Sequence, residues 1–146
     1  MKSIAKKNDA AFEALKKKLI PLCFYDDFWE VEFLILFNAT SDDMQAFLTP
    51  RYGKDVVLDH SLWFRPRQAA LCQRVIKNNV ASIVVAFDKN SSTNRNAIVH
   101  ESVHAAQFVL EQYFLWGDPE VSALYISCIY GRIVWHLKKN GKKLKD

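Results

Sequence analysis

Residues 80–110 read VASIVVAFDKNSSTNRNAIVHESVHAAQFVL, and this stretch decides the fold. Its first eight residues are apolar and rich in β-branched side chains, which predicts a buried strand over 80–87. The polar loop DKNSSTN follows, and from about Asn94 to Phe114 the apolar residues recur at helical spacing. A strand that runs through a polar loop into a long helix indicates a domain built from both kinds of element.

The flanking segments extend this pattern in both directions. Apolar spacing predicts helices over 9–22, 42–48, 68–77 and 119–137, and apolar runs predict strands over 30–37 and 56–58. Pro119 is a favourable first-turn residue, and Gly117 with Asp118 separates the last two helices. We therefore expect one α+β domain over residues 1–146, in which a small sheet packs against the last two helices.

The composition argues against a disulfide-stabilised, an exported or a membrane-inserted protein. The chain has 146 residues, of which 50% are hydrophobic, and this is enough for one core that needs no disulfide bonds. Three cysteines, Cys23, Cys72 and Cys128, lie far apart and form no CxxC pair, which favours a reducing cytosol. The apolar runs are too short to span a bilayer, and the N-terminus lacks a signal-peptide core. We expect a cytoplasmic protein that is neither exported nor inserted in a membrane.

Lysines give the chain its net charge of +4 and cluster near both ends. The clustered residues are Lys2, Lys6, Lys7, Lys16, Lys17, Lys18, Lys138, Lys139, Lys142, Lys143 and Lys145. Such clusters are typical of solvated helix faces and tails, and we expect residues 1–8 and 138–146 to be flexible. They also leave open an acidic or nucleic-acid partner.

The helix predicted after the polar loop contains the motif HESVH, with His100, Glu101 and His104. Residues four apart lie on one face of a helix, so the two imidazoles can converge on a single metal ion. Glu101 sits one residue further round, where a carboxylate can take a proton from a zinc-bound water. Two ordinary histidines satisfied by hydrogen bonds are the structural alternative. The spacing favours a zinc site with Glu101 as general base.

A catalytic zinc usually has three protein ligands and one open position. Glu120 follows His104 by 16 residues, at the start of the next predicted helix, and is our candidate for the third ligand. The alternative is an acidic residue placed in a first turn because the helix dipole favours it there. The sequence therefore predicts a site of His100, His104 and Glu120 around Zn²⁺.

The motif HESVH followed by a glutamate on a second helix resembles the gluzincin branch of the zinc metallopeptidases, in the reduced form of the minigluzincins. It is also similar to small HExxH proteins of bacteriophages, in which a segment like NAIVHESVHAAQ precedes one like PEVSALYISCIYGRI. The likeness covers about residues 80–137. It implies a zincin-like fold, a zinc ion on His100, His104 and Glu120, and Glu101 activating water against a peptide carbonyl. It also implies that a strand such as 80–87 holds an extended substrate.

The chain departs from many gluzincins because no downstream His or Tyr can be assigned to the oxyanion and no second domain walls the cleft. Weak oxyanion candidates are His60, Tyr113, Tyr125 and His136, and candidates for orienting the imidazoles are Asn96, Gln107 and Glu111. We expect a zinc-dependent peptidase acting on a peptide or protein. The alternative is a non-catalytic zincin-fold protein, of the kind that phages encode, that binds a host factor or nucleic acid.

Overall fold

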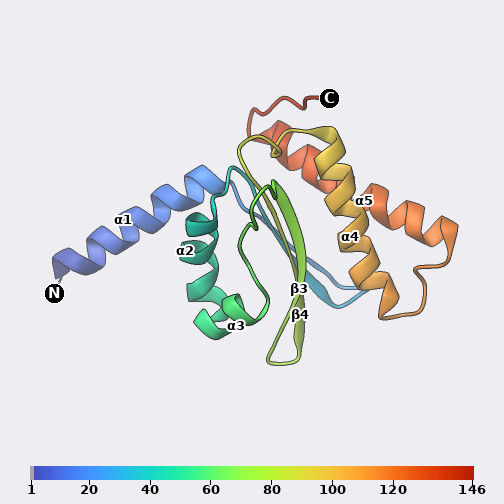
Figure 1. Cartoon of the computed structure of the whole chain (residues 1–146), viewed down its shortest axis with the longest axis horizontal. Helices are drawn as coiled ribbons and strands as arrows, with labels where there is room; N and C mark the ends of the chain where they lie inside the picture. Colours follow the sequence, from blue (N-terminus) through green and yellow to red (C-terminus); the bar gives the residue numbers. More distant parts are fainter. Residues whose placement is uncertain (1) are drawn as a thin grey trace.

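The computed structural model describes the backbone of residues 2–146 and the side chains of residues 8–146. Within that range the elements are α1 (Lys2–Leu19), β1 (Leu22–Asp26), β2 (Val31–Leu36), α2 (Ser41–Tyr52), α3 (Lys54–Asp59), β3 (Ala70–Lys77), β4 (Val80–Phe87), α4 (Arg95–Glu111) and α5 (Pro119–Lys139). Figure 1 shows the sheet with α1, α2 and α3 toward one face and α4 and α5 toward the other. The α+β class is confirmed.

The described strands form one mixed sheet in the order β1-β2-β4-β3. β2 and β4 pair in parallel, whereas β1 pairs with β2 and β3 pairs with β4 in antiparallel fashion. The two central strands, VEFLIL and VASIVVAF, carry near-continuous apolar runs because both of their faces are covered by helices. The two edges of the sheet are therefore β1 and β3.

The core has two halves, one on each face of the sheet, because successive side chains of a strand alternate between its faces. Phe33, Ile83 and Val85 point toward α4 and α5 and pack with Ile98 and Ile133. Leu34, Leu36, Val84 and Ala86 point the other way and pack with Met44 and Leu48 of α2. The predicted packing of a sheet against the last two helices is confirmed. The second helical layer was not predicted.

The segment 68–77, predicted as a helix, is the edge strand β3 from Ala70 to Lys77. It pairs along its whole length with β4, from Ala70 opposite Phe87 to Lys77 opposite Val80. Asn78 and Asn79 between the strands both have positive φ, of 51° and 62°, as a tight two-residue hairpin requires. The prediction was wrong because pairing with the next strand, and not helical periodicity, sets the conformation of this segment.

In the N-terminal half of the chain one strand prediction was wrong, and one predicted helix is present but ends earlier than expected. The strand predicted over 56–58 is part of the short helix α3, which buries Val57 and does not pair with the sheet. The helix predicted over 9–22 ends at Leu19, because Ile20 adopts φ of 36° and Pro21 cannot continue the helix. The residues that follow Pro21 form the edge strand β1, which was not predicted.

The C-terminal tail is held to the start of α4. Lys145 donates its backbone N–H to the Thr93 carbonyl at 2.7 Å, and its own carbonyl accepts from the Arg95 N–H at 2.8 Å. Of the residues predicted to be flexible, 138 and 139 lie in α5, while Met1 and the side chains of residues 2–7 lie outside the described residues. No helix in residues 2–146 is both long and apolar enough to cross a membrane.

Asp43 anchors the first turn of α2, and its replacement by Asn should make the protein less stable at neutral pH. Its carboxylate accepts from the Thr40 N–H at 3.0 Å and from Lys18 Nζ at 2.5 Å, while Thr40 Oγ1 accepts from the Asp43 N–H. Burial acts to raise the pKa of Asp43, but the hydrogen bonds from Lys18 and Thr40 outweigh it and lower the pKa. We expect a loss of about 1 kcal/mol.

The pH dependence of this effect follows from the direction of the shift. A carboxyl whose pKa is lower in the folded state stabilises the fold above its unfolded pKa of about 3.9, and this contribution disappears as the pH falls through the folded pKa. Urea denaturation of wild type and Asp43→Asn at pH 7 and pH 3 measures the difference in unfolding free energy between the two proteins. An equal difference in unfolding free energy at both pH values would contradict the assignment.

Candidate metal centre

The loop between β4 and α4 fixes the start of the helix that carries the HExxH motif. Asp88 Oδ1 accepts from the N–H groups of Asn90 and Ser91, and Ser92 Oγ lies 2.6 Å from the Asp88 carbonyl and accepts from the Asn38 N–H. Asn94 then caps α4 by accepting from the Ala97 N–H at 2.9 Å. The buried strand β4 therefore determines where the first turns of α4 lie.

His100 and His104 converge as the helical spacing predicts. Their Nε2 atoms are 3.0 Å apart, and their rings meet edge to face with centroids 4.6 Å apart. Two imidazoles that bind one tetrahedral zinc ion at 2.0–2.1 Å have nitrogen atoms about 3.3 Å apart. Burial and the neighbouring charge of His100 lower the pKa of His104, which favours its neutral form. The arrangement of the pair fits a shared metal ion.

Glu101 lies beside the pair and is buried, with 6% of its surface exposed. Its side chain makes no hydrogen bond to the described residues 8–146, and its oxygens are not fully buried, so solvent can reach them. Burial raises the pKa of Glu101 above its usual value, and the charge of His100 opposes this. An unpartnered carboxyl next to two convergent imidazoles is suited to accept a proton from a ligand or substrate.

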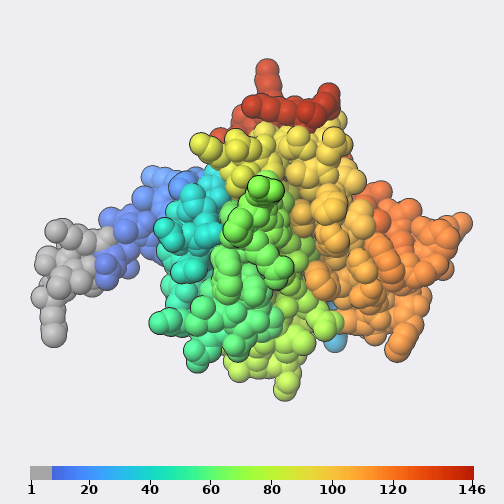
Figure 2. All heavy atoms as spheres, viewed as in Figure 1, coloured from blue at the N-terminus to red at the C-terminus, as the bar shows by residue number. Residues whose placement is uncertain are grey.

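These three side chains open into a pocket of about 420 Å³ between α4 and the edge strand β3. Its walls come from α4, from β3 and from the segment just before β3. The lining residues are Gln68, Ala70, Leu71, Cys72, Gln73, His100, Glu101, His104 and Phe108. In Figure 2 the surfaces of α4 and of the chain that leads into β3 lie side by side on the face in view. The two imidazoles lie on the exposed margin of α4 and face this pocket.

The structure does not bring Glu120 to the pair. Glu120 is exposed in the first turn of α5, after the N-cap Asp118, and does not line the pocket. Within residues 8–146 no three His, Cys, Asp or Glu side chains are grouped closely enough to hold a metal ion. The structure thus assembles two of the three predicted ligands and the predicted base. The role of Glu120 as the third ligand stays a prediction.

The weaker candidates other than Asn96 are engaged elsewhere. Tyr125 donates its hydroxyl to Asp26, Tyr113 donates to the Trp29 carbonyl, and His60 and His136 lie against backbone carbonyl oxygens. Gln107 donates to Glu111 at 2.7 Å, and neither residue nor Asn96 is hydrogen-bonded to an imidazole. None of the tyrosine or histidine candidates lines the pocket.

Strand 80–87 cannot have the substrate-holding role that the resemblance implies. This strand is β4, and its two edges are already hydrogen-bonded to β2 and β3. The strand that borders the pocket and has a free edge among the described residues is β3. An extended chain could pair there without displacing another strand.

The sequence did not identify the five pocket residues of segment 68–77, among them Gln68, Cys72 and Gln73, because this segment was predicted as a helix. A signal was present. Asn78-Asn79 joins two apolar runs and is typical of a hairpin turn, so it could have indicated that residues 70–77 pair with 80–87. That pairing places Cys72 opposite Val85, on the face that α4 covers.

Comparisons of the chain with models of known families, with curated proteins and with solved structures give no match. Functional interpretation therefore starts from the pocket itself, with its two imidazoles, its buried carboxyl and its free strand edge.

Proposed function

We propose that the protein is a zinc-dependent metallohydrolase of the gluzincin type, acting as a peptidase at the pocket between α4 and β3. The observation that carries the proposal is the 3.0 Å approach of the two Nε2 atoms beside the buried, unpartnered Glu101. Two convergent imidazoles and one uncoordinated carboxyl are the parts that a zinc hydrolase needs on its HExxH helix. When bound, zinc supplies a more acidic water and polarises the carbonyl of the substrate.

In this proposal each residue of the pocket has a distinct task. His100 and His104 hold the metal ion. Glu101 takes a proton from the attacking water while the oxygen of this water bonds to the carbonyl carbon of the peptide. Glu101 then gives that proton to the nitrogen of the leaving amine as the C–N bond breaks. The free edge of β3 offers backbone donors and acceptors to an extended peptide, which favours an unfolded or loop substrate.

Metal removal tests this function directly. Protein purified without chelators should contain about one zinc per chain and should cleave a disordered protein such as casein. A chelator should remove the zinc and abolish the cleavage, and added zinc should restore both the metal content and the activity. Added zinc should also raise the melting temperature, because a ligand at 100 times its Kd stabilises the fold by about 2.7 kcal/mol. A His100→Ala, His104→Ala double variant should show neither effect. Protein that carries no zinc and gains no stability from it would overturn the proposal.

The third ligand has its own test. We keep Glu120 in that role because it stands in the first turn of the helix that follows the HExxH helix, although the structure groups no third His, Cys, Asp or Glu of residues 8–146, Glu120 included, with the pair. Glu120→Ala should then weaken zinc binding at least 100-fold in a competition titration. Glu111→Ala, which removes an exposed carboxylate at the end of α4, is the matched control. Equal affinities in the two variants would exclude Glu120.

We also propose that the protein acts in the cytosol. Cys23, Cys72 and Cys128 are all unpaired, and unpaired thiols are usual in a reducing compartment.

A non-catalytic binding protein is the second candidate, favoured by a different surface. Large apolar side chains are exposed around Trp29, where Phe28 is 79% exposed, Phe114 95% and Leu124 73%. Exposed apolar patches often mark protein interfaces. In that case the biological effect should survive the loss of Glu101, whereas in the peptidase model it should not.

A further inference from the structure

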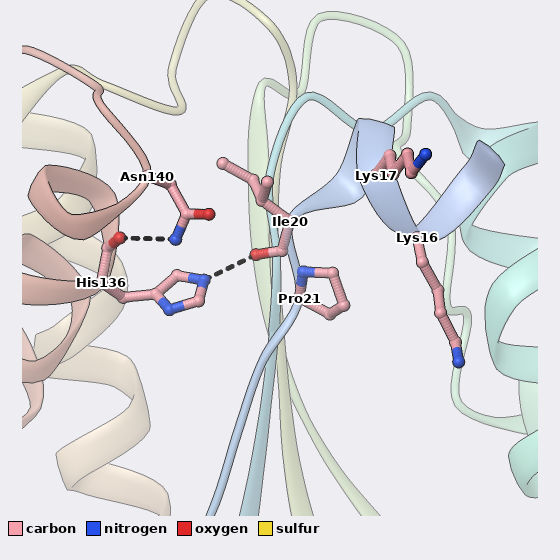
Figure 3. Close-up of a pocket in the computed structure, with 6 residues that line it drawn as sticks. All are labelled: Lys16, Lys17, Ile20, Pro21, His136 and Asn140. Atoms are coloured by element: carbon pink, nitrogen blue, oxygen red, sulfur yellow. Dashed lines mark hydrogen bonds between the residues drawn. The ribbon is translucent and has the colours of Figure 1, made fainter. Parts of the chain in front are cut away.

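The ends of α1 and α5 meet beside β1, at the edge of the sheet opposite the His pair. His136 Nε2 donates to the Ile20 carbonyl at 2.8 Å, although 116 positions separate the two residues. Asn140 donates its side-chain amide to the His136 carbonyl, also at 2.8 Å. Figure 3 shows this junction, with the Ile20–Pro21 segment between the two helix ends. Two lysine-rich segments that are distant in the sequence are therefore adjacent in space.

A shallow pocket of about 410 Å³ lies at the junction, with Ile20 and Pro21 between a lysine side and a histidine side. In Figure 3, Lys16 and Lys17 extend from the end of α1 on one side, and His136 and Asn140 lie on the other. Lys16 has an acidic neighbour, Glu13 at 3.4 Å, but this exposed pair leaves most of the local charge in place. The result is a solvent-exposed recess with positive charge on its lysine side.

The outward side of α5 continues this positive surface. Arg132, Trp135 and Lys139 follow each other at intervals of three and four residues, which places them on one helix face. Trp135 is 63% exposed, and Lys139 Nζ lies 4.9 Å from its ring centroid. Residues 121–145 contain no acidic residue and six basic ones. We call Lys16, Lys17, Arg132, Trp135, His136 and Lys139 the basic face.

The opposite end of α5 carries the opposite charge. Asp118 and Glu120 stand at its first turn, and the neighbouring β1–β2 turn contributes Asp26, Asp27 and Glu30. A 21-residue helix is about 30 Å long, so the charge changes sign over roughly four Debye lengths at physiological salt. A polyanion is attracted to one end of α5 and repelled by the other.

We propose that the basic face binds single-stranded nucleic acid, with its lysines neutralising phosphates and one base stacking on Trp135. Basic side chains around an exposed aromatic ring are how proteins bind single strands without reading their sequence. A membrane surface fits less well, since Trp135 is flanked by Arg132 and Lys139 and not by an apolar stripe. The pocket between α4 and β3 lies at the other edge of the sheet, so a nucleic-acid strand bound to the basic face leaves that pocket open.

Fluorescence anisotropy with labelled 20-nucleotide oligo-dT tests the proposal on the full chain. With about four phosphate contacts, affinity should fall about 50-fold between 50 and 200 mM salt. Trp135→Ala should weaken oligo-dT binding about tenfold and leave the binding of a 20-base-pair duplex nearly unchanged, because only an unpaired base can stack on the ring. Glu101→Gln should bind oligo-dT like wild type, which keeps this test separate from that of the peptidase.

Charge reversal locates the site. The triple variant Lys16→Glu, Lys17→Glu, Lys139→Glu should lose at least tenfold in affinity, with melting temperature measured to confirm folding. The matched control Lys54→Glu, Arg65→Glu, Arg67→Glu changes net charge equally at exposed positions away from the junction, and should lose less than threefold. Equal losses in the two triples, a larger loss in the control, or binding only to anionic lipid vesicles would each overturn the proposal.

Discussion

Glu101→Gln is expected to abolish peptide hydrolysis while leaving zinc binding intact. Gln has almost the same shape as Glu but cannot accept the proton of the attacking water, and a positioned general base contributes about 10²–10⁴-fold to a rate. Glu101 is also buried without a hydrogen-bond partner, so an uncharged side chain does not destabilise this position. We therefore expect kcat to fall by at least 100-fold with an unchanged zinc content.

The matched control is Glu111→Gln, which makes the same chemical change on the same helix at an exposed position outside the pocket. Initial rates on casein and zinc content by mass spectrometry are the two measurements. A Glu101→Gln variant that hydrolyses at the wild-type rate would exclude Glu101 as the base. A variant that loses its zinc would instead show that Glu101 helps to bind the metal.

The part of the site that could be predicted is the part that lies within one helix. His100 and His104 converge because residues four apart share a helix face, and this holds wherever the helix lies in the fold. Glu120 differs, because its distance from the pair depends on how α4 and α5 cross and on the turn between them. Single-sequence patterns do not determine that geometry, and in the structure Glu120 faces solvent.

The same distinction separates the elements that were predicted from those that were not. β2, β4, α4 and α5 carry long apolar patterns, and the structure has them close to the predicted bounds. β1 and β3 are edge strands of mixed composition, so their conformation depends on pairing with β2 and β4. β3 forms one wall of the candidate metal centre, so that wall could not be predicted without this strand.

Phe87→Ala should give the largest loss of stability among the substitutions considered. Phe87 is fully buried at the end of β4, and its ring stacks on Phe37 with centroids 5.6 Å apart. Its carbonyl also accepts from the Ala39 N–H at 2.9 Å, so the backbone around it is fixed and cannot easily close a cavity. Truncating a buried Phe costs about 3–5 kcal/mol, a large part of the 5–15 kcal/mol that holds a typical domain folded.

Urea denaturation followed by tryptophan fluorescence measures this loss, with Phe28→Ala as the control because Phe28 is largely exposed and should change stability by less than about 0.5 kcal/mol. A loss below 1 kcal/mol for Phe87→Ala would contradict the packing of α4 and α5 on this end of β4.

Zinc titration of the folded Phe87→Ala variant adds a second comparison. His100 and His104 are held together by a single helix, so their convergence should survive a cavity beneath α4. The position of a ligand supplied by α5 should not survive it. A variant that is much less stable yet binds zinc with wild-type affinity would indicate that the His pair alone sets that affinity.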